Sequence, residues 1–317
     1  MKSESMAINI VRSLLIFLVI LIHCTPFKDS YPNVQNGILA FVIPLFLFIT
    51  GYLFNVGKTW KEFADYITRM LIMYAVFETA YIILSYFLPV RDGVSELSLP
   101  VILEKLVLKP LGPYWYLHTM IICSGTYYLS HRLSLKVGID RAIWVSLFLC
   151  VLMSYCSPLL GLMSPLAYFS GVITRNCGIR FCSIFKGAFV AIPIGFVTLL
   201  YGIVCNHEYA SQLTYYCIIL GVCTIESLVW CTKKFPSKVC RVLDYIGGNT
   251  LPIYLFHPLF TLLSKHILRG FIDNGYVISY SLTVIVFATA GSLMLGYAMD
   301  KTGISRLLFN RNMLRRL

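Results

Sequence analysis

The stretch RSLLIFLVILIH, residues 12–23, decides the fold of this chain. Nine of the ten residues between Arg12 and His23 are apolar, and the stretch lies within an apolar run over residues 7–24. A helix of this length and composition is typical of a membrane span. The run ends in IHCTPFKDS, without the small-residue pattern of a signal-peptide cleavage site. We therefore expect it to remain in place as a transmembrane helix.

The composition of the whole chain agrees with a membrane protein. Of its 317 residues, 58% are hydrophobic and 13% are charged, and the mean hydropathy is +0.78. These are too few charges to coat a soluble protein of this size. The net charge of +12 favours basic loops facing anionic lipid over nucleic-acid binding. The eleven cysteines lie mostly in apolar runs without CxxC spacing, so we expect neither a disulfide framework nor a metal site.

Apolar runs recur along the chain at membrane length. The runs cover residues 7–24, 37–56, 70–88, 114–133, 142–157, 159–173, 184–205, 213–231, 251–268 and 276–299. Pro158 separates the short fifth and sixth runs. The sequence predicts an all-α, polytopic integral membrane helix bundle of about ten transmembrane helices, a single domain over 1–317 without a soluble domain.

The distribution of basic residues predicts the orientation of this bundle. With the N-terminus inside, the cytoplasmic segments are the N-terminus, 57–69, 132–141, 174–186, 232–250 and the C-terminal tail. These segments hold 19 of the 26 Lys and Arg residues, whereas the outer segments hold six. Such an asymmetry is the positive-inside pattern. We expect both termini to be cytoplasmic.

Five ionisable residues within the predicted spans are candidates for a functional site: Arg12, His23, Glu78, Glu226 and His257. Such residues are costly in lipid and usually face the bundle interior at functional sites. Arg12 and His23 are eleven residues apart, about 20° from three full helical turns, so they project from one face with an axial separation of roughly 16 Å. The alternative is that Arg12 snorkels to the membrane surface and His23 is an interfacial ring.

His257 lies in the segment YIGGNTLPIYLFHPLF. Asn249 or Thr250 could cap a helix there, and Pro252 would then occupy its first turn, where proline is tolerated. Pro258 should free a backbone carbonyl one turn earlier. A second intramembrane histidine favours a lined polar site, although a buried core histidine beside a kink has the same pattern.

Three further features admit two interpretations. Glu78 and Glu226 could pair with the histidines, each orienting a ring and raising its basicity, or they could bond to hydroxyls of other helices. Trp115, in PYWYLHTM, fits the interfacial aromatic belt, but it could also stack on a sugar ring. The amphipathic stretch within the outer loop 89–112 could be a lid, or a surface helix that covers the bundle.

Four motifs together resemble acyltransferase family 3, the multi-pass bacterial membrane acyltransferases of surface glycans. They are R-x10-H in the first run, PLFLFITGYLF in the second, YWYL opening the fourth and IGGNTLPIYLFHP in the ninth. The resemblance covers about residues 7–299. It implies transfer of an acyl group, usually acetyl, from cytoplasmic acyl-CoA to a hydroxyl of a cell-surface or lipid-linked glycan. It also implies a multi-pass protein of the bacterial inner membrane.

The resemblance also implies roles for individual residues. Arg12 and His23 match the essential pair of the family, and Arg69 matches a basic residue that holds the CoA part of the donor. The family's second basic residue near Arg69 is missing, and Met73 stands where a proline is common. His23 would act as base or as acyl carrier. Further candidates for contact with donor or acceptor are Trp115, His257, Asn249 and Glu78. The esterase-like domain of some relatives is not expected.

Other functional classes remain as alternatives. A multi-pass exporter of glycans or lipid-linked sugars would also have Pro-interrupted spans and intramembrane charges. It would leave the R-x10-H spacing and the cytoplasmic arginines unexplained. A membrane-bound O-acyltransferase of another family would have a different pattern of spans, and a membrane scaffold would have little use for five intramembrane ionisable residues.

Overall fold

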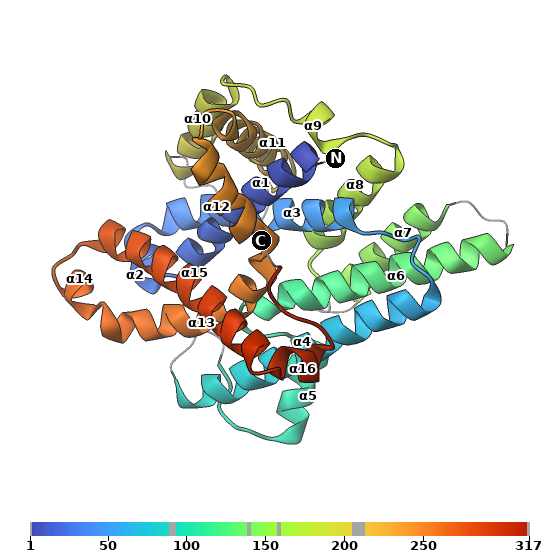
Figure 1. Cartoon of the computed structure of the whole chain (residues 1–317), viewed down its shortest axis with the longest axis horizontal. Coiled ribbons are helices and arrows are strands. Elements are labelled where there is room, and N and C mark those ends of the chain that lie inside the picture. The colour runs from blue at the N-terminus through green and yellow to red at the C-terminus, as the bar shows by residue number, and fades with distance from the viewer. Residues whose placement is uncertain (1, 89–92, 138–140, 157–159, 205–212, 316–317) are drawn as a thin grey trace. The chain divides into compact units, whose positions relative to one another are not determined.

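Every regular element in the described part of the chain is a helix (Figure 1). A computed structural model describes residues 2–88, 93–137, 141–156, 160–204 and 213–315. The elements are α1 (Lys2–Ile22), α2 (Thr25–Ser30), α3 (Pro32–Leu53), α4 (Trp60–Phe87), α5 (Leu99–Val107), η1 (Gly112–Tyr114), α6 (Trp115–Val137), α7 (Ala142–Cys156), α8 (Met163–Asn176), α9 (Phe181–Ile184), α10 (Ala191–Val204), α11 (Leu213–Thr232), α12 (Ser237–Gly248), α13 (Thr250–Ile267), α14 (Arg269–Asp273), α15 (Val277–Lys301) and α16 (Ile304–Phe309). The all-α prediction is confirmed for these residues.

The ten apolar runs correspond, in chain order, to α1, α3, α4, α6, α7, α8, α10, α11, α13 and α15. Within the described ranges, four helices are long and apolar enough to cross a membrane: Glu4–Ile22, Pro32–Leu53, Trp60–Phe87 and Val277–Lys301. Shorter apolar helices occur in α7, α10 and α11. The count of ten spans and the cytoplasmic position of the termini stay predictions, and the break at Pro158 lies outside the described residues.

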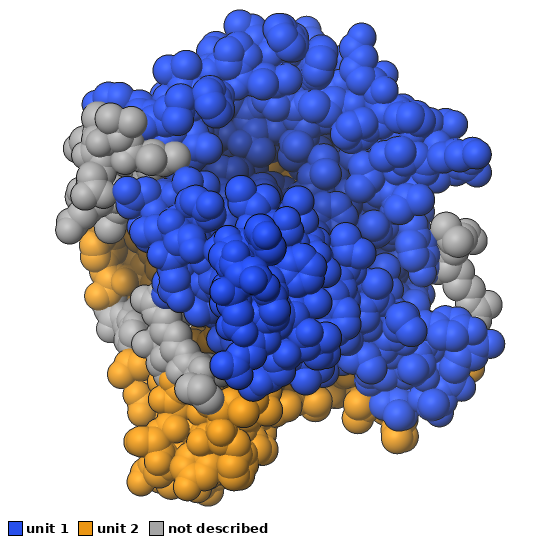
Figure 2. Space-filling model, turned by 90° about the vertical axis from the view of Figure 1, so that its left-hand side faces the viewer, with its two compact units in different colours: residues 1–46, 179–305, 312–317 blue, residues 47–178, 306–311 orange. Residues whose placement is uncertain are grey.

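The chain divides into two compact units, which Figure 2 colours separately. Unit 1 comprises residues 1–46, 179–305 and 312–317, and unit 2 comprises residues 47–178 and 306–311. Unit 1 therefore holds α1, α2, α9 to α15 and the first part of α3, whereas unit 2 holds α4 to α8 with η1.

In unit 1, α1 packs against α11, α12, α13 and α15, and its apolar side chains Val11, Leu15 and Ile20 are fully buried. The contact with α12 is close because Gly247 has no side chain. A Cβ atom at Gly247 would stand 1.7 Å from the carbonyl oxygen of Asn9. Any larger residue there would push α12 away from α1.

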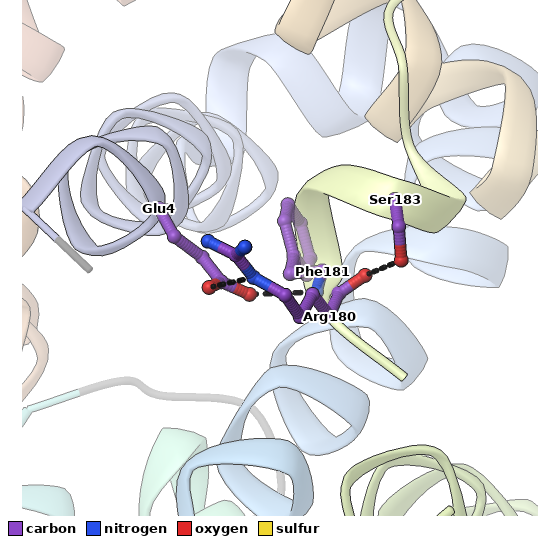
Figure 3. A network of polar contacts seen from close by, with 4 residues as sticks. All are labelled: Glu4, Arg180, Phe181 and Ser183. Carbon is purple, nitrogen blue, oxygen red and sulfur yellow. Dashed lines mark hydrogen bonds and ion pairs between the residues drawn. The ribbon is translucent and has the colours of Figure 1, made fainter. Parts of the chain in front are cut away.

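The start of α1 is joined by hydrogen bonds to other segments of unit 1. The Glu4 carboxylate accepts the Phe181 N–H at 2.7 Å and lies 3.4 Å from Arg180 Nε (Figure 3). One turn further along α1, Asn9 Nδ2 donates to Asp244 Oδ1 at 2.8 Å. The N-terminal segment, residues 180–181 and α12 therefore meet at one end of this unit.

In unit 2, the last turns of α3 lie directly against α8. A Cβ at Gly51 would be 2.0 Å from the Tyr168 carbonyl oxygen, and one at Gly171 would be 2.0 Å from the Phe48 carbonyl oxygen. The two glycines are thus a reciprocal pair that permits backbone contact.

The predicted surface segment in the outer loop forms α5, which packs on α4. Its side chains Ile102 and Leu106 contact a buried cluster of Ile82, Val94 and Leu111, while the opposite face of the helix is exposed. This arrangement agrees with the interpretation of a helix that covers the bundle.

Candidate functional site

Arg12 is held on α1 by a hydroxyl of α13. Its Nη2 atom donates to Thr250 Oγ1 at 2.5 Å, and the guanidinium is partly buried. Thr250 is the first residue of α13, so its side chain stands at the end of unit 1 where α12 turns into α13. The contact places a permanent cation beside the first turn of α13.

His23 lies where α1 ends, and its ring bonds to the backbone of its own helix. The backbone N–H of His23 donates to the Ile20 carbonyl at 3.1 Å, three residues back, which is a tighter turn than that of an α-helix. The ring nitrogen Nδ1 lies 2.7 Å from the carbonyl oxygen of Val19, one turn back. Because a carbonyl oxygen can only accept, Nδ1 must carry the proton. In the neutral ring, Nε2 then keeps its lone pair.

His257 also carries its proton on Nδ1, but for a different structural reason. Pro258 has no N–H, so it cannot donate the usual helical hydrogen bond to the Tyr254 carbonyl. His257 Nδ1 lies 2.8 Å from that oxygen and 3.3 Å from the Ile253 oxygen. The carbonyl that Pro258 was expected to free is that of Tyr254, and His257 Nδ1–H donates to it. Nε2 of His257 is buried and has no hydrogen-bond partner in the described part of the chain.

The two imidazoles are in contact with each other. Their ring centroids are 5.1 Å apart with an interplanar angle of 76°, an edge-to-face arrangement. Arg12 and His23 thus both contact α13, which agrees with the single face expected from helical phase. Four residues of unit 1, Arg12, His23, Thr250 and His257, form the candidate site on two neighbouring helices.

Two polar residues of α15, Thr289 and Ser292, are not among the site residues predicted from the sequence. Thr289 and Ser292 are buried, and their hydroxyl oxygens have no hydrogen-bond partner among the described residues. With Gly296 they follow one stripe of small residues along the helix. That spacing was visible in the sequence, but Ser and Thr are common in membrane helices, and only packing reveals that these hydroxyls are unpartnered.

The prediction that Asn249 or Thr250 caps α13 is wrong. Asn249 occupies the N-cap position but makes no capping hydrogen bond through its side chain. Its Nδ2 donates to the Tyr245 carbonyl at 2.9 Å, and its Oδ1 accepts the Arg315 N–H at 2.6 Å. Because α12 ends directly before Asn249, its side chain binds the last turn of α12 and the C-terminal segment. The Thr250 hydroxyl binds Arg12 instead.

The two intramembrane glutamates bind backbone N–H groups. In unit 2, Glu78 Oε1 accepts from the Leu111 N–H at 2.5 Å. In unit 1, Glu226 Oε2 accepts from Gly187 at 2.5 Å and from Ala188 at 2.9 Å. These bonds run to backbone N–H groups of other segments, not to the hydroxyls of other helices that the sequence suggested, and none of them orients a histidine ring.

Arg69 and Trp115 lie in unit 2. Arg69 is on α4, and its Nε atom is buried without a hydrogen-bond partner in the described ranges. Trp115 begins α6 directly after η1 and is partly exposed. The nearby His118 is buried, and its Nε2 lies 3.1 Å from the Val107 carbonyl at the end of α5. His118 therefore fastens the surface helix.

A family model described as an acyltransferase domain, that of acyltransferase family 3, matches residues 6–299. The chain belongs to this family, since the match covers nearly its whole length. No curated protein and no solved structure matches the chain. The family and the long apolar helices together define a multi-pass membrane protein whose class of reaction is acyl transfer.

Proposed function

We propose that this protein moves an acyl group, most simply acetyl, from cytoplasmic acyl-CoA to a hydroxyl of a cell-surface or lipid-linked glycan. The bacterial inner membrane is the compartment where such a donor and acceptor meet. The observation that carries the proposal is the pair of imidazoles whose Nδ1–H groups are tied to backbone carbonyls. This tautomer turns the basic nitrogen of each ring away from its own helix, as general-base catalysis requires.

Arg12 suits the donor end of this reaction. A guanidinium offers five N–H donors in a planar fork that matches phosphate oxygens, and the Nη2 atom of Arg12 bonds to Thr250. The CoA part of the donor is a polyanion, and the reacting thioester lies at the far end of its pantetheine arm. A donor held by Arg12 could therefore present its thioester further along α1, toward His23. Arg69, with its unpartnered Nε, is a second candidate for phosphate binding.

His23 suits the proton transfer. The acceptor hydroxyl gives its proton to Nε2 of His23 as its oxygen attacks the thioester carbon. The new C–O bond forms, the carbon–sulfur bond breaks, and the CoA thiolate leaves with the proton taken back from His23. His257 lies in ring contact and can orient the reacting imidazole or share the proton. The covalent alternative is that His23 Nε2 attacks first and holds the acyl group before the acceptor arrives.

Transfer by the purified protein tests this function. Proteoliposomes receive radiolabelled acetyl-CoA and a glycan acceptor, and the label in the glycan is measured. We expect His23→Ala to abolish transfer while acyl-CoA binding stays within about twofold, since general-base catalysis supplies about 10²- to 10⁴-fold in rate. Arg12→Ala should raise the KM for acetyl-CoA at least ~10-fold, and Arg12→Lys should restore part of it, since lysine keeps the charge but not the fork.

Two results would contradict the proposal. Normal glycan acylation by the His23→Ala protein would remove His23 from the chemistry. Movement of unmodified glycan across the membrane, without label transfer, would identify an exporter instead. Label that stays on the wild-type protein when acceptor is withheld, and is lost in His23→Ala, would support the covalent route.

A further inference from the structure

Four serine and threonine residues of α15 differ in their hydrogen bonds. Ser281 and Thr283 donate to the carbonyls one turn back, each at 2.8 Å, as hydroxyls in membrane helices usually do. Thr289 and Ser292 lie on the same helix and are buried, with exposed fractions of 6% and 0%, but their oxygens bond to nothing in the described part of the chain.

Leaving such groups unpartnered is unfavourable. A buried hydroxyl without a hydrogen bond costs roughly 1–3 kcal/mol, and valine or alanine would occupy the same space without that cost. The neighbouring hydroxyls show that bonding to the helix backbone is available on α15. Two adjacent exceptions on one face therefore indicate hydroxyls that serve a ligand.

The position of these hydroxyls along the bundle follows from the packing of α15 on α13, which lie side by side (Figure 1). Gly296 stands against Pro252, since a Cβ there would be 3.5 Å from the Pro252 Cβ. At the other end, the Tyr280 and Ser264 hydroxyls are 2.8 Å apart. The two helices are therefore antiparallel.

The number of residues from the contact of Gly296 with Pro252 gives the position of each residue along the helix axis. At 1.5 Å per residue, Ser292 and Thr289 lie roughly 6 Å and 10 Å along α15, and His257 lies roughly 7.5 Å along α13. The two hydroxyls thus bracket His257 along the bundle axis. α1, which holds His23, packs against both helices.

We propose that Thr289 and Ser292 donate hydrogen bonds to the carbonyl oxygen of the acyl thioester and stabilise the oxyanion that forms on it. This inference rests on the proposed acyl transfer. When the acceptor oxygen bonds to the thioester carbon, the π electron pair of the carbonyl moves onto its oxygen. The hydroxyl hydrogens of Thr289 and Ser292 bind that charge, and they keep their protons. The pair returns as the carbon–sulfur bond breaks.

The test compares donors with matched controls in the full-length protein. Ser292→Ala and Thr289→Val each remove one unpartnered hydroxyl. We expect each to lower kcat for acetyl transfer about 10²- to 10³-fold, as the loss of one oxyanion donor does elsewhere, while the KM for acetyl-CoA stays within about twofold. Thr289→Ser keeps the donor and should retain kcat within a few-fold. Ser281→Ala, at an equally buried position whose hydroxyl bonds to the backbone, should leave kcat within twofold.

Thermal unfolding of the same variants separates a structural role from a chemical one. Ser292→Ala and Thr289→Val should have a Tm equal to or above that of the wild type, because each removes a buried hydroxyl that no described residue binds. A lowered Tm together with a proportionate loss of kcat would overturn the inference. So would a wild-type kcat in both variants.

The two proposals fail in distinguishable ways. If the wild type transfers acetyl and the two variants do so equally well, only the assignment of the donors is wrong. If the wild type transfers no acyl group from acetyl-CoA to any glycan, both are overturned.

Discussion

The Tyr254 carbonyl accepts a hydrogen bond from an imidazole because Pro258, four residues along, has no N–H to offer. Pro258→Ala would supply that N–H and compete with the ring of His257 for the same oxygen. We expect the helix to gain stability and His257 to lose its fixed tautomer. Acetyl transfer should fall about 10-fold, less than the 10²- to 10⁴-fold that loss of an acid–base group costs, because the imidazole itself remains. The rate of transfer and the Tm are the measurements.

Pro44 in α3 provides the control, since it is also a proline inside a helix of unit 1. Pro44→Ala should leave the rate of transfer within twofold of the wild type. A Pro258→Ala protein with full activity would show that the tie between His257 and Tyr254 is dispensable.

The second residue-scale prediction concerns His257 Nε2. Asparagine at position 257 can still donate to a carbonyl one turn back, but it has no atom at the place of Nε2. We expect His257→Asn to remain folded, with a Tm within a few degrees of the wild type, and to lose at least ~100-fold in kcat. Transfer at the wild-type rate would reduce His257 to a packing residue.

Sequence reasoning located the ionisable part of the site and missed its hydroxyls. Arg12, His23 and His257 stand out because charge or imidazole in an apolar run is rare, and the structure brings all three to the contact of α1 with α13. Thr289 and Ser292 could not be chosen in the same way. A hydroxyl in an apolar run normally bonds to its own helix, and only the packed structure identifies Thr289 and Ser292 as hydroxyls without a partner among the described residues.

At the scale of elements, the turn between α12 and α13 holds the C-terminal segment. Asn249 accepts the Arg315 N–H, and the Asp300 carboxylate accepts the N–H groups of Met313 and Leu314 at 2.8 Å and 3.0 Å. We expect Asn249→Ala to destabilise the protein by about 0.5–1.5 kcal/mol for each hydrogen bond lost, since it removes the partner of the Arg315 N–H and of the Tyr245 carbonyl. The measurements are the Tm and the rate at which trypsin removes the C-terminal residues.

Asn274→Ala is the matched control, because the Asn274 side chain bonds locally, to the Gly270 carbonyl, at the exposed residue that follows α14. It should leave both the Tm and the cleavage rate unchanged. Equal protection of the tail in the wild type and Asn249→Ala would show that Asp300 holds it without help.

Helices were predictable where the length of an apolar run alone determines them. Each apolar run became a helix, because lipid-length hydrophobic sequence has few other folded states. The ends were less predictable. Asn249 has a good capping side chain, but α12 and α13 abut at that residue, and its amide binds the neighbouring backbone instead. Cap prediction assumes a free turn before the helix, and this chain has none there.

At the scale of the whole molecule, hydrogen bonds within unit 1 bring together segments that the distribution of Lys and Arg predicts to be cytoplasmic. Glu4 binds residues 180–181 (Figure 3). Asn9 binds Asp244, so three segments predicted to be cytoplasmic meet at one end. The division into two units could not have been predicted, since apolar runs define the lengths of helices and not their neighbours.

Two native cysteines make the orientation testable. Cys177 and Cys182 are exposed and lie in the segment 174–186. Cys182 belongs to unit 1 and follows Phe181, which binds Glu4, whereas Cys177 is one of the last residues of unit 2 in this segment. A membrane-impermeant maleimide should leave them unlabelled in intact cells and label them in inside-out vesicles. A protein with both changed to serine and with Arg269→Cys, an exposed position on a predicted outer segment, should have the opposite pattern. Because the contacts of Glu4 and Asn9 keep three segments together, labelling of Cys182 from outside would place the N-terminus outside as well. The cytoplasmic donor could then not reach Arg12 from its own side, and the direction of the proposed transfer would have to be reversed.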